Sequence, residues 1–352
     1  MSDDYLWDKS GTPDPEIEKL EGALGKLRFN RVAPVFPSAE QLMGARTSQD
    51  SLRNWLRLGF SAAFAGILLI VGLGVLWRLR ANVEAGWQVL QIAGTPRIGD
   101  RSLSDTGNRI GIGQVIETDG QSRAEIEVSE VGRVQIDPET RLRVLKAPSG
   151  RSRLALDRGT IHARIWALPG VFTVDTPSAR AVDLGCAYTL HVDDNGDGLI
   201  RTTMGWVGFK LADHEAFIPA GAACRTHVKT GPGLPYFEDA AETFRSAVGI
   251  FDSPVSSQEN RATAIHTMLV HSRKQDALSL WHLLSRVDDP ERTEVYDRLA
   301  ELVPPPSGVT REGIQKLNRE MLDRWWNALD LGNIWLWRHW ERSWSEGERS
   351  AK

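Results

Sequence analysis

The stretch AEIEVSEVGRVQIDPETRLRVL, residues 124–145, decides the fold of the middle of this chain, because apolar and polar side chains alternate along it. The alternation is clearest in the segments AEIEV (124–128), RVQID (133–137) and RLRVL (141–145). Successive side chains of a β-strand point to opposite faces, so each segment predicts a strand with one apolar and one polar face. Turn residues such as Val131-Gly132 stand between the segments.

The same pattern continues toward the C-terminus, as the following segments show: TIHARI (160–165), VFTV (171–174), YTLHV (188–192), LIRTT (199–203), WVGF (206–209) and EAFI (215–218). Turn signals such as Arg158-Gly159 and Asn195-Gly196 separate them. Many short strands with regular turns are typical of an all-β sandwich or roll. We expect one such domain over residues 83–229, which is long enough to bury its own core.

A helical region is predicted after the Pro/Gly-rich bridge TGPGLPYF (230–237), over residues 238–352. Helical spacing of apolar residues is evident in three segments: TAIHTMLVHSRKQDALSLWHLLSRV (263–287), RTEVYDRLAELV (292–303) and GVTREGIQKLNREMLDRWWNAL (308–329). Thr310 is a suitable N-cap for the last of them. These segments predict a small α-helical bundle at the C-terminus.

Six tryptophans are concentrated near the end of the chain: Trp325, Trp326, Trp335, Trp337, Trp340 and Trp344. Tryptophan is large and amphipathic, which suits both protein interfaces and membrane interfaces. Two interpretations follow. Either the final helix packs on its own bundle, or the cluster, with its interleaved arginines, contacts a partner or a lipid surface.

On the N-terminal side, residues 58–77 read LGFSAAFAGILLIVGLGVLW and contain no charged side chain. A helix of this length reaches about 30 Å, the thickness of the hydrocarbon core of a bilayer. Trp55 and Trp77 lie at its two ends, where indole rings prefer the headgroup layer. The segment therefore predicts a single transmembrane helix rather than a buried core helix. Because 57 residues precede it, a cleaved signal peptide fits poorly.

The charges that flank this segment do not orient it. Three basic residues precede it within about 20 positions (Arg46, Arg53 and Arg57), and three follow it (Arg78, Arg80 and Arg97). The positive-inside rule therefore returns a tie.

Residues 1–57 form a polar tail with one amphipathic helix, in SGTPDPEIEKLEGALGKLRF (10–29). Asp14 or Ser10 can cap this helix, and Pro15 suits its first turn. Such a tail buries too little apolar surface to be a robust domain alone. We expect its apolar residues to contact a partner: Tyr5, Leu6, Trp7, Ile17, Leu20, Leu24 and Leu27. A helix lying on the membrane surface is the other interpretation.

Composition and motifs give no support for catalysis. The chain has 352 residues, 42 basic and 46 acidic, and a net charge of −4, so charge gives no argument for direct nucleic-acid binding. No nucleophile elbow, phosphate-binding loop, dinucleotide fingerprint or paired-histidine zinc motif occurs. We therefore expect no enzyme, no cofactor and no metal site.

The acidic run 193–198, DDNGDG, matches the opening of a calcium loop, but Met204 occupies the twelfth position, where a bidentate Glu is needed. A hairpin turn is the preferred interpretation. The chain has two cysteines, Cys186 and Cys224, which permit one disulfide, although the sequence alone does not show that they are close.

The motifs of residues 94–224 resemble those of a FecR-type domain. The most specific stretch is FTVDTPSARAVDLGCAYTLHVDDNGDG (172–198), followed by GWV (205–207) and PAGAAC (219–224). In the family this run reads F-x-V-x-T-P and then G-T-x-[YF]. Six residues match that pattern: Phe172, Val174, Thr176, Pro177, Gly185 and Tyr188. Cys186 replaces the usual Thr.

The resemblance implies a single-pass regulator of the bacterial inner membrane, with its N-terminus in the cytoplasm and its C-terminus in the periplasm. It implies an extracytoplasmic-function sigma factor as the inner partner and an outer, unidentified periplasmic partner. It also places Cys186 and Cys224 in an oxidising compartment, where a disulfide persists. The 57-residue tail and the Trp-rich helical region depart from the ordinary pattern of the family.

The fold that we expect is therefore multidomain, with a transmembrane helix (58–77), an all-β FecR-like domain and a helical C-terminal bundle. The expected function is anti-sigma-like: the protein passes a periplasmic signal to a cytoplasmic sigma factor by protein–protein binding. The alternative is a membrane-anchored periplasmic binding or scaffold protein without a sigma-factor partner.

Overall fold

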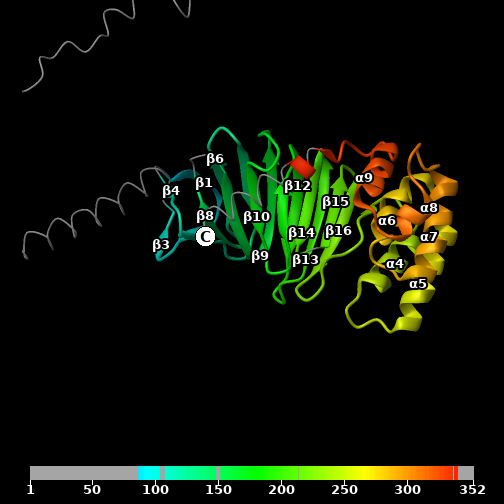
Figure 1. Cartoon of the computed structure of the whole chain (residues 1–352). Coiled ribbons are helices and arrows are strands. Elements are labelled where there is room, and N and C mark those ends of the chain that lie inside the picture. The colour runs from blue at the N-terminus through cyan, green and yellow to red at the C-terminus, as the bar shows by residue number, and fades with distance from the viewer. Residues whose placement is uncertain (1–85, 104–107, 148–150, 213, 336, 340–352) are drawn as a thin grey trace, which may run out of the picture. The chain divides into compact units, whose positions relative to one another are not determined.

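The computed structural model describes residues 86–103, 108–147, 151–212, 214–335 and 337–339, all within one compact unit, Gly72–Lys352 (Figure 1). The predicted transmembrane segment 58–77 and the tail 1–57 lie outside the described residues. Within the described ranges, no helix is both long and apolar enough to cross a membrane. The transmembrane helix therefore stays a prediction.

The β region consists of two sheets. Sheet A has the strand order β4 (Arg109–Ile110), β1 (Trp87–Ala93), β6 (Arg123–Val128), β7 (Gly132–Ile136), β9 (Ser152–Ile165), β12 (Ala187–Val192), β13 (Gly198–Met204) and β16 (Ala222–His227). Two short strands, β17 (Gly231–Pro232) and β18 (Tyr236–Phe237), pair with β16. Every pairing in this sheet is antiparallel.

Sheet B has the strand order β3 (Arg101–Ser102), β2 (Arg97–Ile98), β5 (Val115–Glu117), β8 (Arg141–Lys146), β9, β10 (Phe172–Asp175), β11 (Arg180–Asp183), β14 (Trp206–Leu211) and β15 (His214–Pro219). Its one parallel pair is β9 with β10. Side chains from both sheets share one apolar core. In β6, for example, Ala124, Ile126 and Val128 are buried, and the residues between them are partly exposed.

The long strand β9 belongs to both sheets and bends at Gly159, which has φ +92°. Before the bend Leu154 and Leu156 are buried, and after it the buried positions are Ile161, Ala163 and Ile165. The alternation thus shifts by one residue at the bend, so that both halves of the strand face the same core. The turn predicted at Arg158-Gly159 is therefore a corner within one continuous strand.

The strand register gives the β region two ends. Trp87, where the described chain enters sheet A, lies at the same end as the β6–β7 turn (129–131), Ile165, Ala187 and Met204. We call this the proximal end. At the other end, the distal end, lie the β9 corner at Gly159 and the β12–β13 turn (193–197). Because β9 folds back at Gly159, its last residue, Ile165, returns to the end at which β10 begins.

The helices of the C-terminal region gather beside β15 and β16 (Figure 1). They are α4 (Glu242–Asp252), α5 (Gln258–His271), the short 3₁₀ helix η2 (Lys274–Asp276), α6 (Ala277–Leu283), α7 (Asp289–Leu302), α8 (Arg311–Gln315) and α9 (Arg319–Ala328). Their buried residues, among them Phe244, Leu280 and Leu299, belong to the same apolar core cluster as the strands.

A mostly β core followed by a helical C-terminal region confirms the broad fold prediction, but two helices are shorter than the apolar spacing predicted. The predicted helix 263–287 ends at His271, because Asp276 accepts hydrogen bonds from the backbone N–H and the guanidinium of Arg273. The predicted helix 308–329 is divided at Leu317, which has φ +51°. Thr310 caps α8 as expected, accepting a hydrogen bond from Gly313 N at 3.1 Å. The boundaries 83–229 and 238–352 stay predictions.

Candidate functional site

The residues predicted to contact an inner partner, namely Tyr5, Leu6, Trp7, Ile17, Leu20, Leu24 and Leu27, all lie outside the described residues. Their role stays a prediction. The family-motif residues, in contrast, are all described, and they form one continuous feature from β10 to β12.

This motif forms two neighbouring strands and the turns that follow them. Phe172 and Val174 on β10 are fully buried and face the core. Thr176 then closes the β10–β11 turn, because its hydroxyl donates to Ala179 O at 2.8 Å and accepts from Ala179 N at 2.9 Å. Pro177 follows in the same turn, where its fixed φ is favourable. The motif therefore has a structural role here: it fills the core and sets a tight turn.

The second half of the motif contains a buried polar group, Asp183. Gly185 N donates to one carboxyl oxygen of Asp183 at 2.8 Å, and Cys186 Sγ donates to the other at 2.7 Å. Burial raises the pKa of Asp183 to about 7, although these hydrogen bonds act in the opposite direction. Gly185 suits this turn because its φ is +86°. A thiol is a weak donor, so the carboxylate of Asp183 has little compensation for its lost hydration.

Cys186 and Cys224 are both buried and both free thiols. Burial and the neighbouring Asp183 carboxylate raise the pKa of Cys186. Cys224 lies on β16 and pairs with Ile200 of β13, which itself pairs with Leu190 of β12. The whole strand β13 therefore lies between β12 and Cys224. In this structure both cysteines are free thiols, and their pairing stays a prediction.

The β12–β13 turn is a hairpin, as the sequence favoured. Asp193 accepts hydrogen bonds from Asn195 N and Asp197 N at 2.8 and 3.0 Å, and Gly196 has φ +86°. Asp197 in turn accepts from Val228 N and contacts His227 Nδ1 at 2.8 Å. The acidic side chains thus organise the backbone of the turn. Across the described part of the chain, no group of three or more metal-ligating side chains converges.

A second feature is the aromatic junction between sheet B and the helices, centred on Phe217 of β15. The rings of Trp326 and Trp337 lie 5.2 Å from the Phe217 ring, and that of Trp281 lies 6.1 Å away, between centroids. Trp337 lies directly over Gly208 of β14, where a Cβ would come within 2.0 Å of the indole. Only glycine at 208 permits this close approach.

The C-terminal tryptophans thus divide by role. Trp325 is fully buried, donates to Val303 O at 3.1 Å and packs on Tyr296, whereas Trp326 and Trp337 pack against β15. Packing on the protein itself therefore explains these three. Trp335 is different, with 55% of its surface exposed. Trp340 and Trp344 lie outside the described residues.

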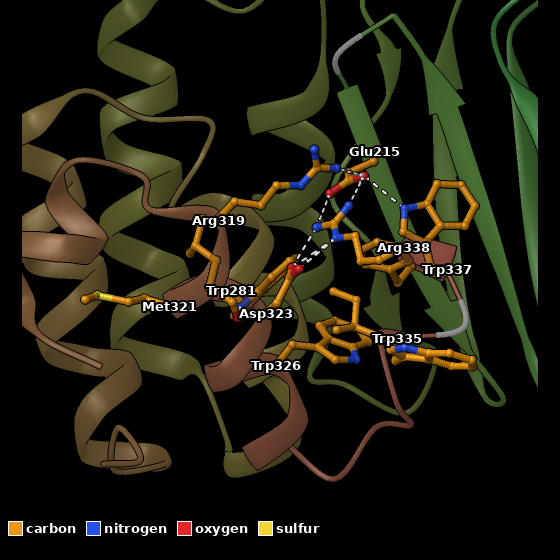
Figure 2. Close-up of polar contacts among 12 residues, drawn as sticks. Glu215, Trp281, Arg319, Met321, Asp323, Trp326, Trp335, Trp337 and Arg338 are labelled. Carbon is orange, nitrogen blue, oxygen red and sulfur yellow. Dashed lines mark hydrogen bonds and ion pairs between the residues drawn. The ribbon is translucent and has the colours of Figure 1, made fainter. Parts of the chain in front are cut away.

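An ion network fixes this junction (Figure 2). Arg338 donates to Glu215 of β15 at 2.8 Å and to Asp323 of α9 at 2.8 Å, and Trp337 Nε1 donates to Glu215 at 3.0 Å. Burial alone would raise the pKa of Glu215, but the hydrogen bonds of Arg338 and Trp337 hold it below its usual value. Glu215 is more than a hundred residues from Arg338 and Trp337 in sequence, so no local pattern could have indicated these contacts.

The outer edge of strand β15 is covered by His282 of α6 and by Arg286, three residues beyond the end of that helix. Phe217 N donates to His282 Nε2 at 3.0 Å, while His282 Nδ1 lies 2.8 Å from Leu278 O. Burial lowers the pKa of His282 to about 3, which keeps the imidazole neutral and able to accept. Arg286 donates to Glu215 O at 3.2 Å. The helices therefore prevent β15 from pairing with another chain.

A shallow groove of about 600 Å³ lies on the outer side of this junction. It is lined by the exposed Trp335 with Arg319, Asp323, Asn327, Ile334 and Arg338. An exposed indole among arginines is a composition that protein interfaces favour. Trp335 also stacks on His339, with centroids 5.1 Å apart.

Together, the two joined sheets and the tight-turn motif of β10–β12 define the class of this region, an all-β domain whose two sheets share one core. Residues 114–205 match the family model described as FecR protein. This part of the chain is therefore a FecR domain, as the resemblance predicted.

Among solved structures, two crystal structures of a candidate anti-sigma factor from Parabacteroides distasonis are similar to this chain. Each is 14% identical with a TM-score of 0.32, and each match covers 38% of this chain and 63% or 62% of the other. At this level the likeness supports no conclusion about function. No curated protein sequence gives a significant match.

Proposed function

We propose that this protein is a single-pass regulator of the bacterial inner membrane, anti-sigma-like and without catalytic activity. Its tail, residues 1–57, binds a sigma factor in the cytoplasm, and its FecR domain and helical region receive a signal in the periplasm. The observation that carries the proposal is the order of three parts in the sequence: a tail whose apolar spacing predicts an amphipathic helix, the uncharged stretch 58–77, and a FecR domain at 114–205.

The described residues support a role in binding rather than chemistry. Three of the polar groups in the core and at the junction, Asp183, Glu215 and His282, are held by hydrogen bonds within the fold. What the structure offers to other molecules is surface, namely the groove beside Trp335 and the two ends of the β region. Such surfaces suit a protein that acts by contact.

The test is capture of a sigma factor by the full-length protein, purified in detergent from its bacterial host. Leu20→Asp combined with Leu24→Asp places two charges on the apolar face of the tail helix, so we expect capture to be lost. Lys26→Asp, on the opposite face of the same helix, is the matched control and retains capture. The bound protein is identified by mass spectrometry.

Two outcomes would overturn the proposal. One is that no sigma factor co-purifies under any condition. The other is that deletion of residues 1–50 leaves the phenotype unchanged, which would favour a membrane-anchored scaffold whose tail only directs insertion. Reporter fusions at both ends of the chain test the predicted orientation separately.

A further inference from the structure

Large apolar side chains are exposed at the proximal end of the β region. Leu168, Trp166, Met204 and Ile112 have 79, 63, 60 and 49% of their surface exposed. In the strands and turns of the β region, one further large apolar side chain, Ile92 on β1, is exposed to this degree, at 50%. Four of the five therefore lie at one end, although they come from three separate segments of sequence.

The strand register places these four side chains at the same end of the strands, spread from β4 to β13 across sheet A. Ile165, the last residue of β9, pairs with Gly132, so Trp166 and Leu168 follow directly at this end. Met204 pairs with Ala187, which in turn pairs with Arg164 of β9. Ile112 follows β4, whose Ile110 pairs with Trp87. The chain enters the β region at this same end, since Trp87 is the first residue of β1.

The backbone beneath this apolar surface is fixed. Trp166 is exposed, yet its Nε1 donates to Glu130 O at 2.7 Å and its N donates to Val131 O at 3.0 Å. The backbone directly after Met204 is equally close-packed, because a Cβ on Gly205 would come within 2.1 Å of Gly185 O. The exposed side chains are therefore held on a rigid frame, and their exposure is a built feature rather than a loose loop.

We propose that the proximal end rests on the lipid headgroup layer of the membrane that residues 58–77 are predicted to cross. The inference builds on the proposed single-pass topology. Residues 78–86, which join the predicted span to Trp87, reach at most about 30 Å when fully extended. A link of this length permits this end to meet the bilayer surface, and an indole with neighbouring Leu, Met and Ile side chains is what the interface of a bilayer favours.

Charges at this end fit the same occupant. Arg164 is exposed two positions before Trp166, and the side chain of Arg133 on the adjacent strand β7 is 58% exposed and also forms ion pairs with Glu125 and Glu127. Exposed arginines beside apolar side chains suit the anionic headgroups of a bacterial membrane. A protein partner is a different occupant, and the experiment below separates the two.

The experiment uses the full chain reconstituted in vesicles of phosphatidylethanolamine and phosphatidylglycerol. Leu168→Cys is labelled with an environment-sensitive NBD fluorophore, and Asn195→Cys, exposed in the distal β12–β13 turn, is the matched control. The native Cys186 and Cys224 are buried and so react little. We expect a blue-shifted emission and strong quenching by doxyl-labelled lipid at 168, and neither effect at 195.

One outcome would overturn the inference but not the proposed anchoring. It is equal, water-like emission at both sites in vesicles that retain the chain after alkaline extraction. Loss of the chain from the vesicles on alkaline extraction would instead overturn the proposed membrane anchoring. A second measurement guards against a local effect of labelling: Trp166→Gln together with Met204→Gln must reduce the lipid quenching at 168. Undiminished quenching in that variant would also count against the inference.

Discussion

The two ends of the β region are built from the same strands but carry opposite chemistry. The proximal end exposes Trp166, Leu168 and Met204. The distal end exposes turns rich in carboxylates, including Asp193, Asp194 and Glu139 around a polar hollow beside Gly159. The difference shows that strand pairing determines only where the strands and their ends lie, while the turn residues determine the surface chemistry of each end.

The carboxyl groups at the two ends also titrate differently. At the distal end, hydrogen bonds from Ser122 and from Gln121 N lower the pKa of Asp119. Burial would raise the pKa of Asp197 there, but its hydrogen bonds with His227 and Val228 lower it. At the proximal end, burial raises the pKa of Asp183 to about 7. The two distal carboxyl groups are thus held in their ionised form, whereas Asp183 keeps its proton up to a pH of about 7.

The largest effect is expected at the distal corner, from Gly159→Ala. A Cβ there would lie 2.3 Å from Thr140 Oγ1 and 2.4 Å from Thr140 Cα, and φ is +92°. Thr140 cannot retreat easily, because its hydroxyl accepts from Thr160 N at 2.9 Å. We expect the free energy of unfolding to fall by about 3–5 kcal/mol, measured by urea denaturation.

The matched control for that change is Gly113→Ala near the proximal end. Gly113 also has a positive φ, +82°, but nothing lies within 4 Å of a Cβ built on it. Only the conformational strain of about 1–2 kcal/mol should remain. Equal losses in the two variants would show that the corner is not held by contact with Thr140.

The next effect concerns pH and Asp183. Its folded pKa of about 7 lies above the ordinary value of 3.8, so the folded state binds this proton more tightly than the unfolded state does. The corresponding stability is fully present below pH 3.8 and is lost as the pH rises through 7. We expect a loss of about 2–4 kcal/mol across this window.

Asp183→Asn removes the titrating group. The unfolding free energy of the wild type should therefore fall relative to that of the variant as the pH rises across that window, and the difference should level off above it. Asp197→Asn at the distal end is the contrasting variant. Its pKa is lowered, so its contribution is present above the ordinary value and is lost as the pH falls. Parallel pH profiles for the two variants would contradict the contrast between the ends.

A smaller effect is expected from Cys186→Ser. The serine hydroxyl donates a stronger hydrogen bond to Asp183 than the thiol does. We expect the protein to gain about 0.5–1.5 kcal/mol at pH 8 and the pKa of Asp183 to fall. Thr at this position, the usual residue of the family, supplies the same hydroxyl but adds a methyl group to a fully buried site. A gain with Ser and a loss with Thr would show that the core here has adapted to Cys.

The sequence predicted the strands whose inward and outward residues alternate strictly, such as β6 and β7, because burial on one face leaves a period of two. It missed β1, although burial alternates along that strand, and it missed β11 and β16, whose consecutive buried residues Ala181-Val182-Asp183 and Ala222-Ala223-Cys224 show no alternation. It also missed the junction at Phe217, because Glu215 and Arg338 meet only in the folded chain. The proximal surface was equally hidden, since its four apolar residues reach the same end of the strands through strand register alone.

The smallest effect should come from Leu168→Gln, and its smallness bears on what this end does. With 79% of its surface exposed, Leu168 contributes little to the core, so unfolding free energy should change by less than about 0.5 kcal/mol. Leu184→Gln, at the same end but 5% exposed, should cost about 3 kcal/mol, because it buries an amide without a partner. Thermal or urea unfolding of the two variants measures the contrast. If Leu168→Gln were as costly as Leu184→Gln, the leucine would serve folding. If Leu168→Gln leaves the unfolding free energy unchanged, folding does not account for an apolar side chain at this position. Contact with lipid, which this variant is expected to weaken, then accounts for it.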